Sequence, residues 1–470
     1  MNCMQNKRTS CYSIVPWISF RDYVLSGETK TILYEQKSHY YYMLSGKAVQ
    51  IWKGLTENTI TVENFLSCLQ LLFVDGIIEW HGEQPIRVTE ESTLVEKLED
   101  IPDSINEAIK EEGYIFDAHW DITNKCNEKC IHCYNANAHN GLRNINTDEL
   151  SFEEAKSLID ELCYLGVFRL VMSGGEVLTK HHFIPLCQYI RQKHIQLIIY
   201  TNALAFTESM LHDLAVLYPS NVCISVYGHT NTVHDNITQI QGSYDKVVLA
   251  LSYFKKYGIE TSHKNTLLTR NYQYWQETLQ KGRQLASVSL VNCTIYPSMD
   301  GDGLSPYRLD ESQMVEVAKS PNSPIYYKRK IHGACNIFKS KDETPCYNRT
   351  NTIYINPHGE VCICISYPCV IASLREENIR ELKRNKRLPF YINDNSTLKG
   401  YELLDNWRSL KISDLKECGH YDYCRFCIDV CPGDAFLLTG DLLNAPENHC
   451  IIAKARYKAY LSDDNKESLL

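Results

Sequence analysis

The sequence lacks an apolar run long enough to cross a bilayer, and its N-terminus does not join a basic segment to an apolar one as a secretory signal does. It also lacks an excess of basic residues, because the formal net charge is -9 at pH 7. These absences predict a cytoplasmic protein, and they argue against nucleic acid or an anionic membrane as a partner. Small molecules and other proteins are the expected partners.

Cysteine, in contrast, is abundant, with 20 residues in a chain of 470. Cytoplasmic thiols are kept reduced, so this number indicates metal binding rather than disulfides, especially because many of the cysteines crowd into three short windows. Seven cysteines outside these windows are interpreted as small buried apolar residues, namely Cys3, Cys11, Cys68, Cys163, Cys187, Cys223 and Cys293.

The pattern of the N-terminal part of the chain predicts short strands, then two helices and then a further strand. Side chains alternate over residues 40–44 as in a strand, and apolar residues recur at helical spacing over 49–55 and 65–72. A short strand is expected at 77–80. This order predicts a small winged-helix unit over residues 1–95.

The middle of the chain alternates between strand-like and helix-like segments. Ser151 and Glu154 form the pattern of a capping box that opens a helix, and Gly166 ends it. Six strands are expected, at 115–123, 168–172, 197–201, 222–226, 259–264 and 288–296. The predicted fold is therefore α/β, with a parallel sheet partly closed into a six-unit (β/α) barrel that resembles a TIM barrel and has its active site at the C-terminal ends of the strands.

Composition places the remaining boundaries. A charged linker is expected over residues 96–113, the barrel over 114–315, and a cysteine-rich block organised around metal over 330–455. The polar segment 456–470 is expected to be a disordered tail.

A group of three cysteines, Cys126, Cys130 and Cys133 in the run CNEKCIHC, follows the first barrel strand. Thiolates are the usual ligands of a four-iron cluster, so three cysteines leave one iron without a protein ligand. An open coordination site is what distinguishes a catalytic metal centre from a structural one. The alternative is a zinc site completed by His132 or His139.

The second strand leads into Ser173-Gly174-Gly175-Glu176. Two glycines allow a close backbone approach, and a carboxylate can accept hydrogen bonds from an ammonium group. At the end of the second strand of the same barrel, this combination indicates a ligand site next to the three cysteines.

Residues 115–300 resemble a radical S-adenosylmethionine (SAM) domain, in which a CxxxCxxC loop is followed by a Gly-Gly-Glu motif that binds the methionine end of SAM. The resemblance continues through Thr201-Asn202-Ala203, Ser225 and the run HDNITQIQGS. It implies that Gly174, Gly175 and Glu176 bind SAM and that Asn202 and Ser225 contact its ribose or carboxylate. His132 stands where the family usually has an aromatic residue beside the adenine.

The C-terminal block resembles a SPASM domain, which holds two auxiliary four-iron four-sulfur clusters. Its pattern begins with C-x12-G-x4-C over Cys346, Gly359 and Cys364, but Tyr421 stands where the family has a cysteine, and Cys424 is extra. The resemblance implies one cluster on Cys335, Cys346, Cys364 and Cys431, and another on Cys418, Cys424, Cys427 and Cys450. Cys362 and Cys369 could replace a member, one cluster could keep an open iron, and zinc knuckles are the alternative for the block.

The N-terminal unit resembles a PqqD-like recognition element, the module that binds leader peptides of ribosomally made, post-translationally modified peptides. In β-augmentation, an extended peptide adds a strand to an exposed sheet edge. The alternative is a winged helix that only packs on the barrel. DNA binding is disfavoured because its second helix has few Lys and Arg residues.

Together these resemblances imply a radical SAM/SPASM maturase with three 4Fe-4S clusters, which cleaves SAM to a 5'-deoxyadenosyl radical and modifies a precursor peptide, for example by a thioether or carbon-carbon crosslink. An electron donor such as flavodoxin or ferredoxin is the second expected partner. A sulfatase-maturing enzyme, an enzyme acting on a small molecule or tetrapyrrole, and a non-catalytic iron-sulfur or zinc scaffold are the alternatives. No catalytic acid or base is identified from the sequence.

Overall fold

The computed structural model describes most of the 470-residue chain. The described residues are 12–57, 69–81, 94–135, 148–298, 305–328, 345, 352–376, 380–381, 410–428 and 430–463. Cys335 and Cys346, two of the expected cluster ligands, lie outside these residues.

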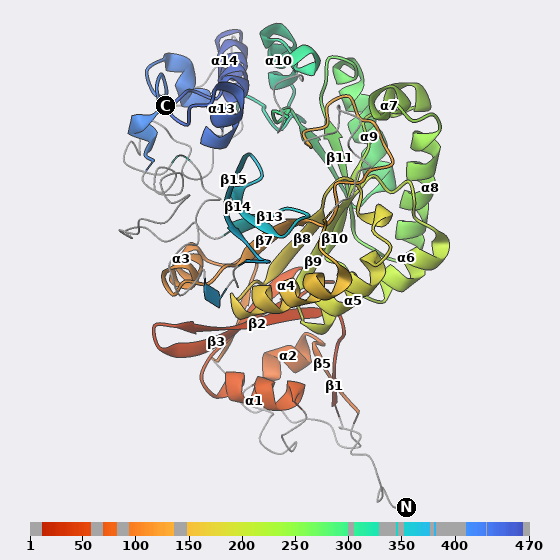
Figure 1. The fold of residues 1–470 in the computed structure, drawn as a ribbon, viewed down its shortest axis with the longest axis vertical. Coiled ribbons are helices and arrows are strands. Elements are labelled where there is room, and N and C mark those ends of the chain that lie inside the picture. The colour runs from red at the N-terminus through yellow and green to blue at the C-terminus, as the bar shows by residue number, and fades with distance from the viewer. Residues whose placement is uncertain are drawn as a thin grey trace, which may run out of the picture.

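A nine-stranded sheet in the order β12-β11-β10-β9-β8-β7-β13-β14-β15 forms the centre of the molecule (Figure 1). The strands are β7 (Asp117–Asp121), β8 (Arg169–Ser173), β9 (Gln196–Thr201), β10 (Asn221–Ser225), β11 (Thr261–Thr266), β12 (Val288–Asn292), β13 (Thr352–Ile355), β14 (Glu360–Cys364) and β15 (Tyr367–Ser373). β7 to β12 are parallel to one another, and these are the six strands that the sequence predicts. The α/β fold with a mainly parallel sheet is therefore confirmed.

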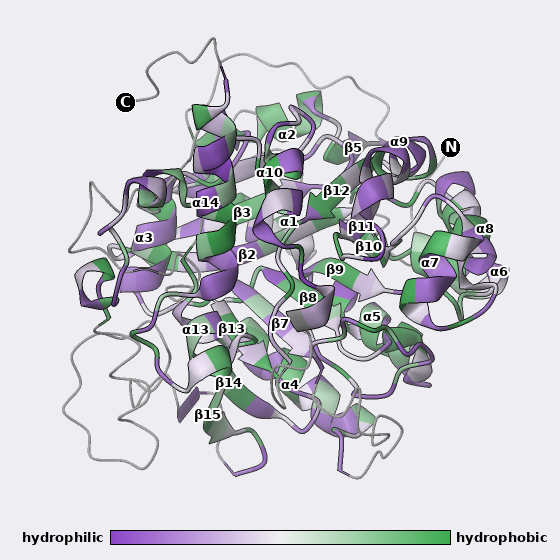
Figure 2. Cartoon of the chain, turned by 90° about the horizontal axis from the view of Figure 1, so that it is seen from above, coloured by the Kyte–Doolittle hydropathy of each residue, from purple (hydrophilic) through white to green (hydrophobic). Residues whose placement is uncertain are grey.

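Helices between these strands cover the outer side of the sheet, where Figure 2 shows them in an arc around β8 to β11. They are α4 (Phe152–Tyr164), α5 (Phe183–Gln192), α6 (Glu208–Ala215), α7 (Asn231–Thr238), α8 (Ser243–Lys256) and α9 (Trp275–Leu285). The capping box of α4 is present, because Glu154 N donates to Ser151 Oγ at 3.3 Å and Ser151 N donates to Glu154 Oε2 at 2.8 Å. Apolar residues of α4, α5, α6 and α8 pack with the buried face of β7 to β10 in the largest core.

The C-terminal block continues the central sheet. β13 pairs in parallel with β7, and β14 and β15 follow as an antiparallel meander. Further helices lie beyond the sheet: α10 (Glu311–Ala318), α13 (Pro432–Thr439) and α14 (Glu447–Leu461). The expected tail boundary at residue 456 falls inside α14, because Ala455 and Ala459 are buried in the core that α14 shares with α10.

The N-terminal part contains a four-stranded antiparallel sheet in the order β2-β3-β4-β6 and a separate pair, β1-β5. The elements are β1 (Tyr12–Ile14), β2 (Ile18–Leu25), β3 (Glu28–Glu35), β4 (Tyr40–Leu44), α1 (Lys47–Thr56), α2 (Gln70–Val74), β5 (Ile78–Trp80), β6 (Val95–Leu98) and α3 (Asp103–Glu111). The expected linker from residue 96 thus contains most of an edge strand and a helix. β6 joins the N-terminal sheet because Val95 is buried in the core of that domain.

The N-terminal domain is docked against the N-terminal ends of the barrel strands, below the sheet in Figure 1. Phe116 and Phe168 immediately precede β7 and β8 and stack with ring centroids 5.1 Å apart. Both lie in one apolar cluster with Tyr23 and Tyr41 of the N-terminal sheet. Tyr23 also donates its hydroxyl proton to the carbonyl of Gly166 at 2.8 Å.

Arg191 of α5 is the polar centre of this interface. Its guanidinium donates to the carbonyl of Ile18 at 3.0 Å and to Ser19 Oγ at 2.7 Å in the N-terminal domain. On the barrel side it donates to the carbonyl of Ile195 at 2.6 Å and to that of Leu217 at 2.9 Å. Burial lowers the pKa of Arg191 to about 10, which still leaves the side chain charged at neutral pH.

Among the helices that the structure describes, none is both long and apolar enough to span a membrane.

We expect Arg191→Met to lower the free energy of unfolding by about 3 kcal/mol, because several buried acceptors lose their donor. Chemical denaturation monitored by circular dichroism measures this loss. Arg283→Met on the exposed side of α9 is the matched control and should change stability by less than about 0.5 kcal/mol. Equal effects of the two substitutions would contradict the assigned role of Arg191.

Candidate active site

The loop that carries the three cysteines lies at the C-terminal end of β7, where the ends of β8, β9 and β10 meet it. Its first half is bonded to the end of β8: Ile122 N donates to Ser173 O at 2.9 Å, Gly175 N to Thr123 O at 2.7 Å, and Glu176 N to Lys125 O at 2.7 Å. The three bonds continue the pairing of β7 and β8 beyond the strands.

The second half of the loop is bonded to the end of α7. Lys129 N donates to Thr238 O and Ile131 N donates to Ile237 O, each at 3.0 Å. That end is itself fixed by Asp235, whose carboxylate accepts hydrogen bonds from Gly242 N at 2.6 Å and Tyr244 N at 3.0 Å. The run HDNITQIQGS therefore forms the corner between α7 and α8 that supports the cysteine loop.

Cys126, Cys130 and Cys133 are all partly buried, and none of them forms a disulfide. Burial raises the pKa of the Cys130 thiol, and so do the nearby Glu128, Cys133 and Cys126, in addition to a hydrogen bond of 3.1 Å from Cys130 Sγ to Glu128 Oε2. Three thiolates in one small volume disfavour one another, whereas a cationic iron cluster favours their deprotonated form. This donor set therefore fits an iron-sulfur cluster.

Gly174 and Gly175 leave room for the cysteine loop. A Cβ atom on Gly175 would lie 2.2 Å from the carbonyl oxygen of Lys125, and one on Gly174 would lie 2.4 Å from that of Thr123. Gly174 also has φ +137°, which residues with a side chain rarely adopt. The atoms that exclude a side chain here belong to the cysteine loop itself, so both glycines are required before any ligand binds.

Glu176 has a buried carboxylate that joins the ends of β8 and β9. Its Oε1 accepts from Thr201 Oγ1 at 2.6 Å and from Leu178 N at 3.1 Å, and its Oε2 accepts from Asn202 N at 2.6 Å. Burial raises the pKa of Glu176 to about 7, although these hydrogen bonds lower it. Among the described residues, one donor bonds to Oε2, whereas a carboxylate oxygen can accept two hydrogen bonds.

Asn202, Ser225 and His132 lie around the same loop. Asn202 Nδ2 donates to Asn127 Oδ1 at 2.6 Å and is 3.9 Å from Cys126 Sγ. Ser225 is the last residue of β10, and the ring of His132 lies edge-on to that of Tyr227, with centroids 4.7 Å apart. The structure thus brings the three predicted residues to the cysteine loop, while their roles toward SAM stay predictions.

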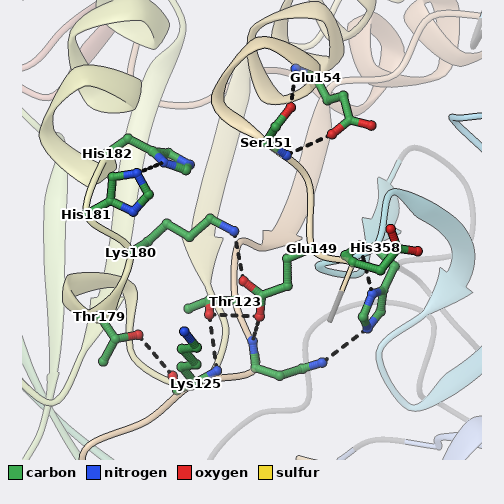
Figure 3. Close-up of polar contacts among 12 residues, drawn as sticks. Thr123, Lys125, Glu149, Ser151, Glu154, Thr179, Lys180, His181, His182 and His358 are labelled. Carbon is green, nitrogen blue, oxygen red and sulfur yellow. Dashed lines mark hydrogen bonds and ion pairs between the residues drawn. The ribbon is translucent and has the colours of Figure 1, made fainter. Parts of the chain in front are cut away.

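A cavity of about 230 Å³ lies on the other side of the loop start, where Figure 3 shows Thr123 and Lys125 beside Glu149 and Lys180. Glu149 accepts hydrogen bonds from Thr123 Oγ1 at 2.9 Å and Asn124 N at 2.8 Å. It also forms a buried ion pair with Lys180 Nζ at 2.8 Å, in which the two side chains are 3% and 8% exposed. Through Glu149, the ion pair fixes Thr123 and Asn124 at the start of the cysteine loop, and no sequence spacing indicated it.

Polar side chains on the inner face of the sheet form a second group that the sequence reading missed. Asp121 accepts from Tyr354 at 2.8 Å and lies 3.2 Å from His119 Nε2, while Lys264 Nζ donates to the hydroxyl of Tyr200 at 3.2 Å. The alternation of Asp117, His119 and Asp121 with apolar residues along β7 was the available signal.

The described cysteines of the C-terminal block fall into two places. The thiols of Cys418, Cys424 and Cys450 lie close enough to influence one another: burial, together with the charges of Cys450 and Cys424, raises the pKa of Cys418 to about 12. Cys427 N donates to Cys424 O at 3.1 Å. Within the described ranges, no three or more His, Cys, Asp and Glu side chains are arranged to hold a single metal ion.

Cys364 and Cys431 lie on neighbouring elements. Cys364 ends β14, and Cys431 is the residue before α13. α13 approaches the β14-β15 hairpin closely, because a Cβ atom on Gly433 would be 2.7 Å from the carbonyl oxygen of Ser366. Both expected cluster groups stay predictions, and the partners Cys335 and Cys346 lie outside the described residues.

Comparisons with known proteins agree with this geometry. Residues 120–281 match the family model of the Radical SAM superfamily. An AdoMet-dependent heme synthase from Methanosarcina barkeri is 23% identical over 359 residues, which cover 71% of this chain and 95% of that protein. The subtilosin biosynthesis protein AlbA from Bacillus subtilis is 23% identical over 264 residues, which cover 53% of this chain and 55% of AlbA.

Among solved structures, Streptococcus suis SuiB bound to S-adenosylmethionine superimposes with a TM-score of 0.53 at 12% identity, covering 93% of this chain and 99% of SuiB. SuiB bound to its precursor peptide SuiA gives a TM-score of 0.51. Residues 120–281 therefore form a radical SAM domain, a domain of enzymes that use a 4Fe-4S cluster and SAM, and the chain shares its fold with SuiB.

We expect Gly175→Ala to lower the iron bound per chain after anaerobic reconstitution by about a third, the share of one four-iron cluster among the three expected, because the added methyl group displaces the cysteine loop. Gly258→Ala is the control: its Cβ would meet no atom within 4 Å, although its φ of +66° costs about 1 kcal/mol for alanine. Iron analysis and absorbance near the sulfur-to-iron charge-transfer band measure the difference. Full iron content in the Gly175 variant would overturn the steric argument.

Glu149→Gln should lower the free energy of unfolding by about 3 kcal/mol, because it leaves the Lys180 ammonium group buried without its counter-charge. The matched control is Glu153→Gln, whose partner is Lys156 in an exposed pair with Glu153 77% exposed. The control should change stability by less than about 0.5 kcal/mol. Urea unfolding compares the two variants, and similar midpoints for both would show that the buried pair does not stabilise the loop.

Proposed function

We propose that this radical SAM enzyme modifies a ribosomally made precursor peptide. The observation that carries the proposal is the attachment of the N-terminal domain to the barrel through Arg191 and the aromatic cluster, together with a fold similarity to SuiB that covers 93% of this chain. SuiB has been solved with its precursor peptide, and AlbA is a biosynthesis protein for the bacteriocin subtilosin.

In this proposal, Cys126, Cys130 and Cys133 hold the cluster and leave one iron open for SAM. Once bound, the cluster supplies the electron that cleaves SAM to methionine and a 5'-deoxyadenosyl radical. Gly174 and Gly175 keep the loop against β8. Glu176 Oε2 accepts a hydrogen bond from the ammonium group of SAM, while Thr201, Leu178 and Asn202 hold the carboxylate in place.

Asn202, Ser225 and His132 complete the proposed SAM site. Asn202 lies beside Cys126, so it can contact the part of SAM next to the open iron. Ser225 ends β10 at the same sheet edge, and His132 with Tyr227 provides aromatic surface for the adenine.

The cysteine-rich block is proposed to be a SPASM domain with two auxiliary 4Fe-4S clusters. Cys418, Cys424, Cys427 and Cys450 belong to one, supported by the mutual electrostatic influence of three of these thiols. Cys335, Cys346, Cys364 and Cys431 belong to the other. A flavodoxin or ferredoxin is the proposed electron donor.

The N-terminal domain, with its antiparallel sheet and two helices, is proposed to be a PqqD-like winged helix that binds the leader of the precursor. The core of the peptide would then reach the cysteine loop, where the sheet face offers Tyr200, Lys264 and His119.

A tetrapyrrole substrate is the second candidate, and the heme synthase alignment favours it because it covers 95% of that relative. The docked N-terminal domain separates the two candidates, since a tetrapyrrole needs no leader-binding unit. In the full-length protein, the first candidate predicts turnover of a precursor peptide and none of a tetrapyrrole, and the second predicts the reverse.

The test combines two measurements on the anaerobically reconstituted protein. With dithionite and SAM, the wild type should form 5'-deoxyadenosine, and the Cys126→Ala, Cys130→Ala, Cys133→Ala triple variant should form none. Co-expression with a candidate precursor peptide should change the mass of that peptide. Equal 5'-deoxyadenosine from both proteins would overturn the cluster assignment, and an unchanged peptide together with an altered tetrapyrrole would overturn the peptide proposal.

A further inference from the structure

The inner face of the central sheet lies opposite the helices. Ile199 and Ile224 pack with the helices in the largest core, so the residues that alternate with them along β9 and β10 point to the inner face. On β11, His263 points to the helix side, because a Cβ atom on Gly282 of α9 would lie 2.4 Å from its Nδ1. Lys264, the next residue of β11, therefore points to the inner face.

Lys264 has neutral neighbours on this face. Its Nζ donates a hydrogen bond to the hydroxyl of Tyr200 at 3.2 Å and lies 4.9 Å from the centroid of the Tyr200 ring. The thiol of Cys223 is also near, and burial raises the pKa of this thiol, so it stays protonated at neutral pH. Burial lowers the pKa of Lys264, but Tyr200 and Cys223 outweigh this effect and the pKa is raised. The side chain is therefore a cation that faces a phenol and a thiol.

Other charged groups of the inner face already have partners. Asp117 accepts a hydrogen bond from Arg169 Nη2 at 2.9 Å, and Asp121 accepts one from the hydroxyl of Tyr354 at 2.8 Å. In the part of the chain that the structure describes, no carboxylate forms an ion pair with Lys264. An ammonium group has three donors, so Lys264 can bind an anion in addition to the phenol.

The position of Lys264 relates it to the proposed SAM site. In the parallel pairing of β10 and β11, Lys264 is opposite Ser225, which ends β10. Its ammonium group, however, is directed to Tyr200, which comes two residues before Asn202. Side chains that share a face repeat every two residues, which is about 6.6 Å along a strand. The ammonium group is therefore directed away from the strand ends that carry Ser225 and Asn202, toward the interior of the barrel.

Apolar side chains lie beside this position. Val288 and Leu290 of the edge strand β12 are opposite Ser262 and Lys264 of β11, so they point to the inner face as well. They are 45% and 43% exposed. A cation next to open apolar surface matches a ligand in which a carboxylate is attached to an apolar body.

We propose that Lys264, positioned by Tyr200, binds a carboxylate of the substrate on the inner face of the sheet. The inference rests on the proposed function and deepens it, because it assumes that the substrate reacts on this side of the SAM site. The carboxylate can come from a glutamate or aspartate side chain of a peptide, or from a propionate group of a tetrapyrrole. An ammonium-carboxylate pair in this partly buried place would fix the orientation of the substrate toward SAM.

Binding to the full-length, anaerobically reconstituted protein tests this site, with SAM present and reductant omitted so that no turnover occurs. Equilibrium dialysis compares two pairs of probes. One pair is a glycine-valine peptide with blocked ends and a central glutamate, and the same peptide with a central glutamine. The other pair is iron coproporphyrin and its tetramethyl ester. The wild type should bind the carboxylate member of one pair at least about tenfold more tightly than the neutral member.

Substitutions of the lysine show whether this preference depends on the cation. Lys264→Gln should remove the preference, whereas Lys264→Arg should keep part of it because the positive charge remains. Lys246→Gln, at an exposed position of α8, is the control and should keep the preference in full. The pair of probes that shows the Lys264-dependent preference identifies the source of the carboxylate.

A second arm keeps Lys264 and remains decisive if thermal melting shows that Lys264→Gln is unfolded. Leu290→Glu places a carboxylate opposite Lys264 on the neighbouring strand, where it can occupy the ammonium group itself. Leu290→Gln is the matched control, with the same size and no charge. We expect the glutamate variant to bind the preferred carboxylate probe about tenfold more weakly than the glutamine variant.

The site is overturned if the wild type prefers neither carboxylate probe, or if the preference persists in Lys264→Gln or, where that variant is unfolded, in Leu290→Glu. Weaker SAM binding by Lys264→Gln with the probe preference intact would assign the ammonium group to the carboxylate of SAM and overturn the substrate site.

The same measurements separate this site from the proposed function. A Lys264-dependent preference for the porphyrin alone would keep the site and overturn the peptide substrate. Conversely, a modified precursor peptide without any Lys264-dependent preference would keep the proposed function and overturn the site.

Discussion

The close approach of two backbones is the constraint on which the site depends. The end of β8 passes so near to residues 123–125 that Gly174 and Gly175 have no room for a side chain, and the hydrogen bonds of Gly175 N and Glu176 N form only at this distance. The cysteine loop is thus an extension of the sheet, not a free loop. A cluster ligand set needs such a frame, because three thiols must be held at fixed positions before iron arrives.

Other contacts hold the remaining sides of the loop, and each uses a different kind of interaction. Two backbone carbonyls at the end of α7 accept hydrogen bonds from backbone N–H groups of the cysteine loop. The buried ion pair of Glu149 and Lys180 fixes the start of that loop. Glu176 ties β8 to β9. Glu149 and Lys180 are buried and paired, and Glu176 is buried and hydrogen-bonded, which is the condition under which such groups specify a position rather than only cost desolvation.

Features that depend on neighbouring residues in the sequence were predictable. The six parallel strands follow from short apolar segments separated by helices, and the placement of Cys126 and Gly175 after the first two strands follows from that order. Pairings between distant segments were not predictable: β13 lies against β7 although they are more than two hundred residues apart, and β6 was assigned to a linker because two of its four residues are charged. Such pairings depend on tertiary burial, as the packing of Val95 in the core illustrates.

The position of the N-terminal domain bears on how a peptide substrate would be handled. This domain contacts Phe116, Gly166 and His194, which precede or lie below the strands, whereas the cysteine loop lies at their opposite ends. β9 alone has six residues, so the two sites are separated by at least about 20 Å along the sheet. An extended chain advances about 3.4 Å per residue, and a bound leader would therefore need roughly six or more residues before the modified position. Binding and reaction would then depend on different parts of the peptide. The leader would fix the position of the peptide on the N-terminal domain, and the site near Cys126 would select the side chain that reacts.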